Sequence, residues 1–290
     1  MATSDSDPQQ TQPQPPTTTS YDSSGWSAAL YNSNASFVYS SAYTSPVLEL
    51  LRAQPGEHIM DFGCGSGELT LEIEKIVKQK EGGYIAAVDF SESMLEKARA
   101  QGLGAFLGDI QDFRFPASEE EYKGPREDFD AVFTNATLHW CKRDPSGVIR
   151  SAKKILRKSG GRFVGEMGGF LNCIGIRGAL AQVLRSRGCN AIERDPWFFP
   201  SPEEYTKLLE AGGFNVTHIS LTPRATPLKV GVIGWMRTFV RSWWLGDLSD
   251  TEAEEIMKEV QDICQVDCQD GNGNWAMIYV RLRFVAVLSS

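Results

Sequence analysis

The chain lacks the long apolar runs that membrane-spanning proteins need. No stretch of the sequence approaches the roughly 20 apolar residues that cross a bilayer as a helix. The N-terminus also lacks the basic and apolar regions that mark a secretory signal peptide. We therefore expect a soluble, cytoplasmic protein without a membrane partner.

Positive charge is scarce as well. Lys and Arg number 29 against 37 Asp and Glu, which gives a formal net charge of −8 at pH 7. This balance argues against a broad phosphate-binding face and so against nucleic acid as a partner. The six cysteines show no spacing typical of a disulfide framework or a zinc site, and no aspartate cluster suggests a metal. We expect free cysteines and a metal-free reaction.

Apolar residues are almost absent from the first twenty positions, which are rich in Pro, Gln, Thr and Ser. Such a segment cannot offset the entropy lost on ordering, so we expect residues 1–22 to form a disordered tail. The remaining residues, 23–290, are expected to form one domain. Its core is predicted at about 46–168, 201–228 and 276–290, and its cap at 23–45 and 229–275.

Strand and helix patterns alternate from Pro46 onward. The predicted strands are 57–61, 84–89, 104–107, 129–135, 162–167, 216–222 and 278–288. The predicted helices are 46–53, 68–79, one capped by Ser91, 145–156, 180–188, 201–213 and 230–265. This alternation implies a parallel sheet with helices on both faces and a ligand beyond the C-terminal strand ends.

A glycine-rich turn, Asp61-Phe62-Gly63-Cys64-Gly65-Ser66-Gly67, joins the first predicted strand to a helix. Glycine has no Cβ, so a ligand can lie close to this backbone, and the free N–H groups at the helix start favour an anionic group. The spacing is G-x-G-x-G, whereas the dinucleotide fingerprint is G-x-G-x-x-G. A nicotinamide-dependent dehydrogenase is therefore a less favoured interpretation.

Two carboxylates follow the next predicted strands. Asp89 ends the second strand, where a carboxylate can accept both hydroxyls of a ribose, although Asp is also a common helix cap there. Asp109 follows the third strand, where it can accept an adenine amino group while Ile110 covers the ring. An Asx-type turn is the alternative role for Asp109.

The succession DFGCGSG, AVDFSESML, GDI, FDAVFTNATLHW and LRKSGGRFVGEMGG resembles motifs I to V of the class I S-adenosylmethionine-dependent methyltransferases. Within that class the chain is most similar to the trans-aconitate methyltransferase-like (methyltransferase type 11) group. The run Asn135–Trp140 and the tryptophan-containing segment 234–248 carry that similarity. The resemblance implies an α/β, Rossmann-like, doubly wound, seven-stranded, mostly parallel sheet with an antiparallel last strand and a helical cap.

The resemblance also implies S-adenosyl-L-methionine as cofactor and assigns residues to it by position. The methionine part would be lined by Asp61, Gly63, Cys64, Gly65 and Gly67. The adenosine would be held by Asp89, Phe90, Met94, Asp109 and Ile110, with Asn135 and Ala136 next to the methyl group. The expected acceptor is a small molecule, with carboxyl O-methylation first and methylation at a hydroxyl, nitrogen or carbon as the alternative. A non-catalytic cofactor-binding homologue is a further alternative.

His139 is the histidine placed to act as a general base for an acceptor that must lose a proton. It can equally hydrogen-bond an acceptor carboxylate or simply pack. Tyr31, Trp140 and Trp235 are candidates for contacting the acceptor. Three arginines near the predicted cap are candidate carboxylate clamps by charge and location: Arg177, Arg237 and Arg241. The sequence predicts neither the acceptor nor the oligomeric state.

Overall fold

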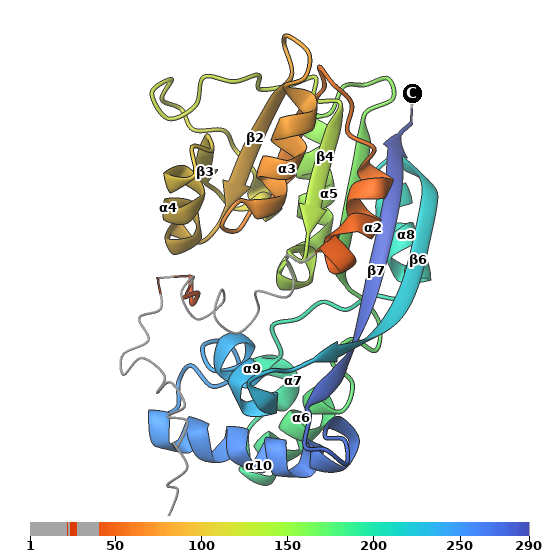
Figure 1. The fold of residues 1–290 in the computed structure, drawn as a ribbon. Helices are drawn as coiled ribbons and strands as arrows, with labels where there is room; N and C mark the ends of the chain where they lie inside the picture. The colour runs from red at the N-terminus through yellow and green to blue at the C-terminus, as the bar shows by residue number, and fades with distance from the viewer. Residues whose placement is uncertain (1–21, 23, 28–40, 290) are drawn as a thin grey trace, which may run out of the picture.

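The computed structural model describes residues 22, 24–27 and 41–289 (Figure 1). The predicted disordered tail lies outside these residues, apart from Asp22. Most of the predicted N-terminal part of the cap lies outside them too.

A seven-stranded sheet forms the centre of the upper lobe in Figure 1, in the order β3-β2-β1-β4-β5-β7-β6. The strands are β1 His58–Phe62, β2 Tyr84–Asp89, β3 Ala105–Leu107, β4 Ala131–Asn135, β5 Arg162–Gly168, β6 Phe214–Pro227 and β7 Ala276–Leu288. The first five pair in parallel, and β7 runs antiparallel to both β5 and β6. The predicted mostly parallel, doubly wound sheet with an antiparallel last strand is confirmed. Its strand order reverses between β1 and β4, the position at which such sheets bind ligands.

Helices cover both faces of this sheet. The α-helices are α2 Ser41–Leu51, α3 Glu68–Val77, α4 Glu92–Ala100, α5 Pro145–Ile155, α6 Ile176–Ser186, α7 Ala191–Arg194, α8 Pro202–Ala211, α9 Gly231–Phe239 and α10 Asp250–Cys268. On one face α2 and α3 pack on Ile59, Phe133 and Val164. On the other, α5 and α8 pack on Met60 and Phe163. Side chains alternate along each strand, so both faces carry a buried apolar core.

A second, helical lobe lies below the sheet, where α6, α7, α9 and α10 gather (Figure 1). The helices α6, α9 and α10 share a hydrophobic cluster that includes Leu180, Trp235, Trp244 and Val260. The long strands β6 and β7 run from the sheet into this lobe and connect the two parts. The lobe therefore sits against the C-terminal ends of the parallel strands.

Several element boundaries differ from the sequence prediction, and three of the differences have a clear physical reason. Strand β6 continues to Pro227, five residues beyond its predicted end, although Pro223 and Pro227 interrupt the pattern. Proline cannot donate a ladder hydrogen bond, but β6 is an edge strand, where that loss is tolerated. Helix α2 begins at Ser41, so Pro46 lies inside it rather than at its start. The predicted helix 230–265 is two helices, because Ser249 forms a capping box that starts α10.

Candidate functional site

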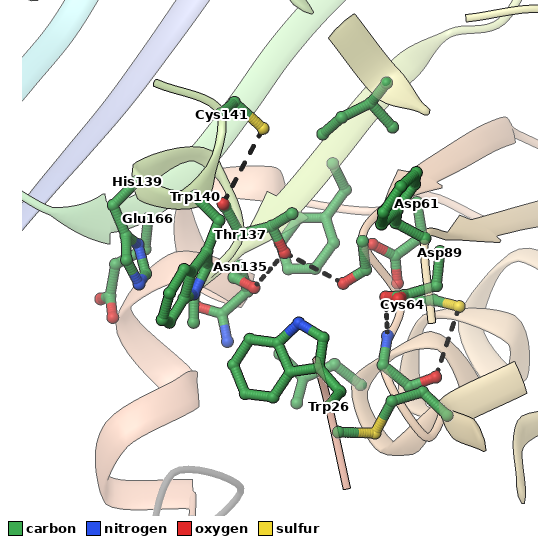
Figure 2. A pocket seen from close by; sticks show the side chains of 18 of the residues that line it. Trp26, Asp61, Cys64, Asp89, Asn135, Thr137, His139, Trp140, Cys141 and Glu166 are labelled. Carbon is green, nitrogen blue, oxygen red and sulfur yellow. Dashed lines mark hydrogen bonds between the residues drawn. The ribbon is translucent and has the colours of Figure 1, made fainter. Parts of the chain in front are cut away.

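A cavity of about 390 Å³ lies at the C-terminal strand ends, and Phe239 and Trp243 of the helical lobe also line it. Figure 2 shows part of its lining. Most of the residues predicted from sequence line it: Asp61, Gly63, Cys64, Gly65, Asp89, Phe90, Met94, Asp109, Ile110, Asn135, Ala136, His139 and Trp140. Two do not, because Gly67 lies at the start of α3 and Trp235 is buried in the helical lobe. Tyr31 lies outside the described residues.

The glycine turn after β1 packs directly against the loop after β4. Gly63 has φ 83°, and a Cβ at this position would lie 2.2 Å from Thr137 Oγ1. The Thr137 hydroxyl bridges the two loops, with Oγ1 3.2 Å from the Gly63 carbonyl oxygen and 3.1 Å from that of Asn135 (Figure 2). Only glycine fits Gly63, because both the backbone conformation and the space exclude a side chain.

Asp61, one residue before the end of β1, is buried at 2% exposure. Burial is the main reason that its pKa rises to about 7, and the nearby Asp89 charge adds to the rise. The hydroxyl of Thr70 on α3 donates to Asp61 Oδ2 at 2.6 Å, which opposes the shift. Near neutral pH this carboxyl is therefore poised to ionise when a cation approaches it.

Asp89 at the end of β2 is held by two backbone donors. The N–H of Gly65 lies 2.8 Å from Oδ2, and the N–H of Ser91 lies 2.9 Å from Oδ1. Burial nevertheless raises the pKa of Asp89 above its ordinary value. Ser91 caps α4 as predicted, accepting a hydrogen bond from the Met94 N–H.

Asp109 is engaged at both of its oxygens. Oδ1 accepts from the Gln111 N–H at 2.9 Å, which makes Asp109 the cap of a short 3-10 helix, Ile110–Asp112. Oδ2 accepts from the guanidinium of Arg143. Although burial opposes the effect, these contacts keep the pKa of Asp109 below its usual value. The Asx-type turn considered in the sequence is thus present.

His139 is buried beside Glu166 and Trp140 (Figure 2). Burial, with the nearby Arg281 charge, holds its pKa well below the ordinary value. The N–H of Gly168 donates to His139 Nδ1 at 3.3 Å, so Nδ1 carries the lone pair and Nε2 the proton. The ring is therefore neutral, and its basic nitrogen is already occupied by a backbone donor.

Sequence reasoning missed a buried group of charges on the β5–β7–β6 face. Glu166 on β5 accepts from Arg281 Nε at 2.9 Å and from Arg283 Nε at 2.5 Å, and Arg224 on β6 joins this group at the cavity wall. The signal was the Arg281-Leu282-Arg283 alternation in an otherwise apolar strand, which puts both guanidinium groups on one face.

The arginines that the sequence favoured as clamps do not line the cavity. Arg177 pairs with Asp195, Arg237 with Glu254 and Arg241 with Asp250. All three pairs belong to the helical lobe and the loop after α7, so a position in or near the predicted cap did not identify the arginines that face the cavity.

Aromatic side chains form the wall on the side of the helical lobe. The ring of Trp26 packs edge-on against that of Trp140, with centroids 5.0 Å apart, and Trp140 lies 5.2 Å from Trp243. Asp22 holds this N-terminal segment in place by accepting hydrogen bonds from the Trp26 N–H and from the hydroxyl of Ser91 on the sheet lobe. The wall thus joins both lobes.

The part of the chain that the structure describes also bears on membrane and metal binding. No helix there is long and apolar enough to cross a membrane. No group of three or more His, Cys, Asp or Glu residues in the same part of the chain is arranged to hold a metal ion.

Known proteins resemble this chain in sequence and fold. The methyltransferase domain model matches residues 60–163, and the protein-L-isoaspartate(D-aspartate) O-methyltransferase model matches residues 16–102. An uncharacterised methyltransferase of Schizosaccharomyces pombe is 33% identical over 90% of this chain and 97% of its own length. A trans-aconitate 2-methyltransferase of Mycolicibacterium gilvum is 32% identical over 45% of each chain. The solved phosphoethanolamine N-methyltransferase 2 of Haemonchus contortus, in complex with phosphomonomethylethanolamine and S-adenosylhomocysteine, shares the fold with TM-score 0.52. It is 14% identical over 93% of this chain and 59% of that one.

Proposed function

Because the chain belongs to the class I S-adenosylmethionine-dependent methyltransferases, we propose that it O-methylates a carboxylate of a small molecule. The choice of a carboxylate rests on one observation: His139 is neutral, and its basic nitrogen already accepts a hydrogen bond. A hydroxyl acceptor, or an amine that is protonated near pH 7, must lose a proton for the transfer, whereas a carboxylate is already ionised at that pH. The buried, neutral His139 accepts a backbone hydrogen bond at its only basic nitrogen, so it is poorly suited to remove a proton.

The cavity has an acidic end, around Asp61 and Asp89, and the residues there fit the cofactor. Gly63, Cys64 and Gly65 line the cavity, and the missing side chain of Gly63 lets the loop after β4 pack against this turn at Thr137. Asn135 Oδ1 is buried without a hydrogen-bond partner and so offers an unused acceptor at the cavity. Asp61 and Asp89 add carboxylates suited to an ammonium group and to ribose hydroxyls.

The cofactor, when bound, supplies a methyl group activated by a positively charged sulfur. In our proposal Asp61 holds the amino-acid end, and Asp89 orients the ribose with its two backbone-fixed oxygens. Phe90, Met94 and Ile110 line the cavity; the first two would lie beside the adenosine, and Ile110 would cover the base. Asn135 and Ala136, which also line the cavity, would lie next to the reacting methyl group. These groups position the reactants, and positioning alone accounts for much of the acceleration of a displacement.

The helical lobe completes the site. Trp26, Trp140 and Trp243 cover the cavity and would exclude water from the transfer. We propose that the cap includes α6 and α7 in addition to residues 229–275, because α6 packs in the same cluster as α9 and α10. A cavity enclosed in this way favours a small-molecule acceptor over a macromolecule.

Isotope transfer tests the proposal. The full chain is incubated with cofactor labelled at the methyl group and a mixture of metabolite carboxylic acids, and the labelled product is then treated with mild alkali. A methyl ester releases its label as volatile methanol, whereas methyl groups on ether oxygen, nitrogen or carbon stay attached. Alkali-stable label would exclude carboxyl O-methylation and favour the alternative acceptor atoms.

A further inference from the structure

Three arginines, two of them paired directly with its carboxylate, lie close to Glu166, which is across the cavity from Asp61 (Figure 2). In the antiparallel register Arg224 lies opposite Tyr279, and Glu166 lies opposite Arg283. Directly paired residues share a sheet face, so Arg224, Arg281, Arg283 and Glu166 all project from the same side. Glu166 and Arg281 are 2% and 6% exposed.

The charges in this group do not balance. Glu166 uses one oxygen for Arg281 and the other for Arg283, which leaves no carboxylate oxygen uncommitted for Arg224. The four side chains therefore carry two more positive than negative charges. Such a surplus is costly away from bulk water unless an anion compensates it.

Arg224 is the arginine of this group that lacks a counter-charge. Its Nε and Nη1 are buried and have no hydrogen-bond partner, while its guanidinium carbon lies 3.8 Å from the centre of the Tyr43 ring on α2. Stacking on an aromatic face fixes the plane of a guanidinium but satisfies none of its N–H groups. Burial and the adjacent Arg281 lower the pKa of Arg224, as expected of a cation lacking its counter-charge.

We propose that Arg224, held by Tyr43 and flanked by Arg281, binds a non-reacting carboxylate of the acceptor. The acceptor then carries at least two carboxylates, one bound at Arg224 and one presented for methylation near Asn135. This inference rests on the proposed function for the identity of the reacting group. The anion subsite itself depends only on the arginine group and its place in the cavity wall.

The test uses the full chain saturated with S-adenosylhomocysteine and a series of α,ω-dicarboxylates of increasing length. Calorimetry compares each dicarboxylate with its own monoamide, which removes one charge with little change in size. We expect the best-fitting dicarboxylate to bind at least about tenfold more tightly than its monoamide, because a charge-assisted contact is lost. Equal binding of the two by the wild-type chain overturns the proposal without any variant.

Substitutions of Arg224 then test whether this side chain causes the preference for a dicarboxylate over its monoamide. Arg224→Gln should abolish the preference for the dicarboxylate, Arg224→Lys should restore part of it, and S-adenosylhomocysteine affinity should stay the same in both. The matched control is Arg187→Gln, because Arg187 forms a surface pair with Glu259 on the helical lobe and does not line the cavity. A preference that survives in Arg224→Gln also overturns the proposal.

The turnover assay separates this inference from the proposed function. Where a dicarboxylate is methylated, Arg224→Gln should raise KM about 10- to 100-fold with little change in kcat. If the product is alkali-stable and Arg224→Gln still raises KM, carboxyl methylation is refuted but the anion subsite is supported. If monocarboxylates give an alkali-labile product and Arg224→Gln leaves KM unchanged, only the anion subsite is refuted.

Discussion

The backbone N–H of Gly65 donates a hydrogen bond to Asp89 Oδ2 at 2.8 Å, which joins the glycine turn after β1 to the end of β2. The second oxygen of Asp89 accepts from the Ser91 N–H, so two backbone groups fix the carboxylate plane. The glycine turn therefore does more than line the cavity. It orients the acidic side chain that we assign to the ribose.

Asp89→Ala should weaken S-adenosylhomocysteine binding about 10- to 100-fold, because one charge-assisted contact is lost and the turn loses its anchor. Calorimetric titration measures the change. Asp112→Ala is a suitable control, since Asp112 is an exposed acid that pairs with the exposed Arg114. Equal affinity of the two variants would contradict the assignment of Asp89 to the cofactor.

The raised pKa of Asp61 predicts that cofactor binding depends on pH. Its pKa is about 7 in the free protein, and a cationic ammonium group binds only to the ionised form. Affinity for S-adenosylhomocysteine should therefore fall about tenfold from pH 8 to pH 6, as protonation competes with binding. Titration across this range measures the effect, and Asp61→Asn should give weaker binding with a flat profile.

The same substitution should have the opposite effect on stability. A carboxyl whose pKa is raised on folding makes the folded state progressively less stable as pH rises from the unfolded-state pKa to the folded value of about 7. Asp61→Asn should therefore raise the thermal unfolding midpoint of the free protein at pH 8, and raise it less at pH 5. Thermal melts at both values check this sign, and a larger gain at pH 5 would contradict the raised pKa.

The parallel half of the sheet could be predicted from sequence because its signals are local. β2 was predicted with the bounds it has, and the start of α3 follows the glycine turn directly. The positions of Asp61 and Asp89 follow from the same local pattern, since each lies at a strand end beside a turn. Local patterns thus predicted the acidic end of the cavity.

The arginine end could not be predicted because it depends on non-local pairing. Arg224 lies beyond the predicted end of β6, between two prolines that mark a loop in most contexts. Its neighbours Arg281 and Glu166 come from strands more than fifty residues away in each direction, and only the β5–β7–β6 register brings them together. No pattern within a short window contains that information.

The hydrogen bonds of Asp22 suggest that the segment around Asp22 and Trp26 helps to retain bound ligands. Its carboxylate accepts from the Ser91 hydroxyl and from the Ser93 N–H at 3.2 Å, and it places Trp26 against Trp140. Asp22→Ala should speed S-adenosylhomocysteine release about tenfold, because hydrogen bonds between this segment and α4 are lost. Stopped-flow dissociation measures the rate. Trp26→Phe, which keeps an aromatic ring, should change it much less.

His139→Gln decides whether the reaction needs a base. The side-chain carbonyl of Gln can accept the Gly168 N–H that His139 Nδ1 accepts at 3.3 Å, so the local backbone should be kept. We expect kcat within about threefold of wild type, a change smaller than the loss of a general base brings. Because burial keeps the His139 pKa well below its ordinary value, wild-type kcat should also show no imidazole titration between about pH 6 and 8. A large loss of kcat with unchanged cofactor affinity would instead identify His139 as the base and remove the main support for a carboxylate acceptor.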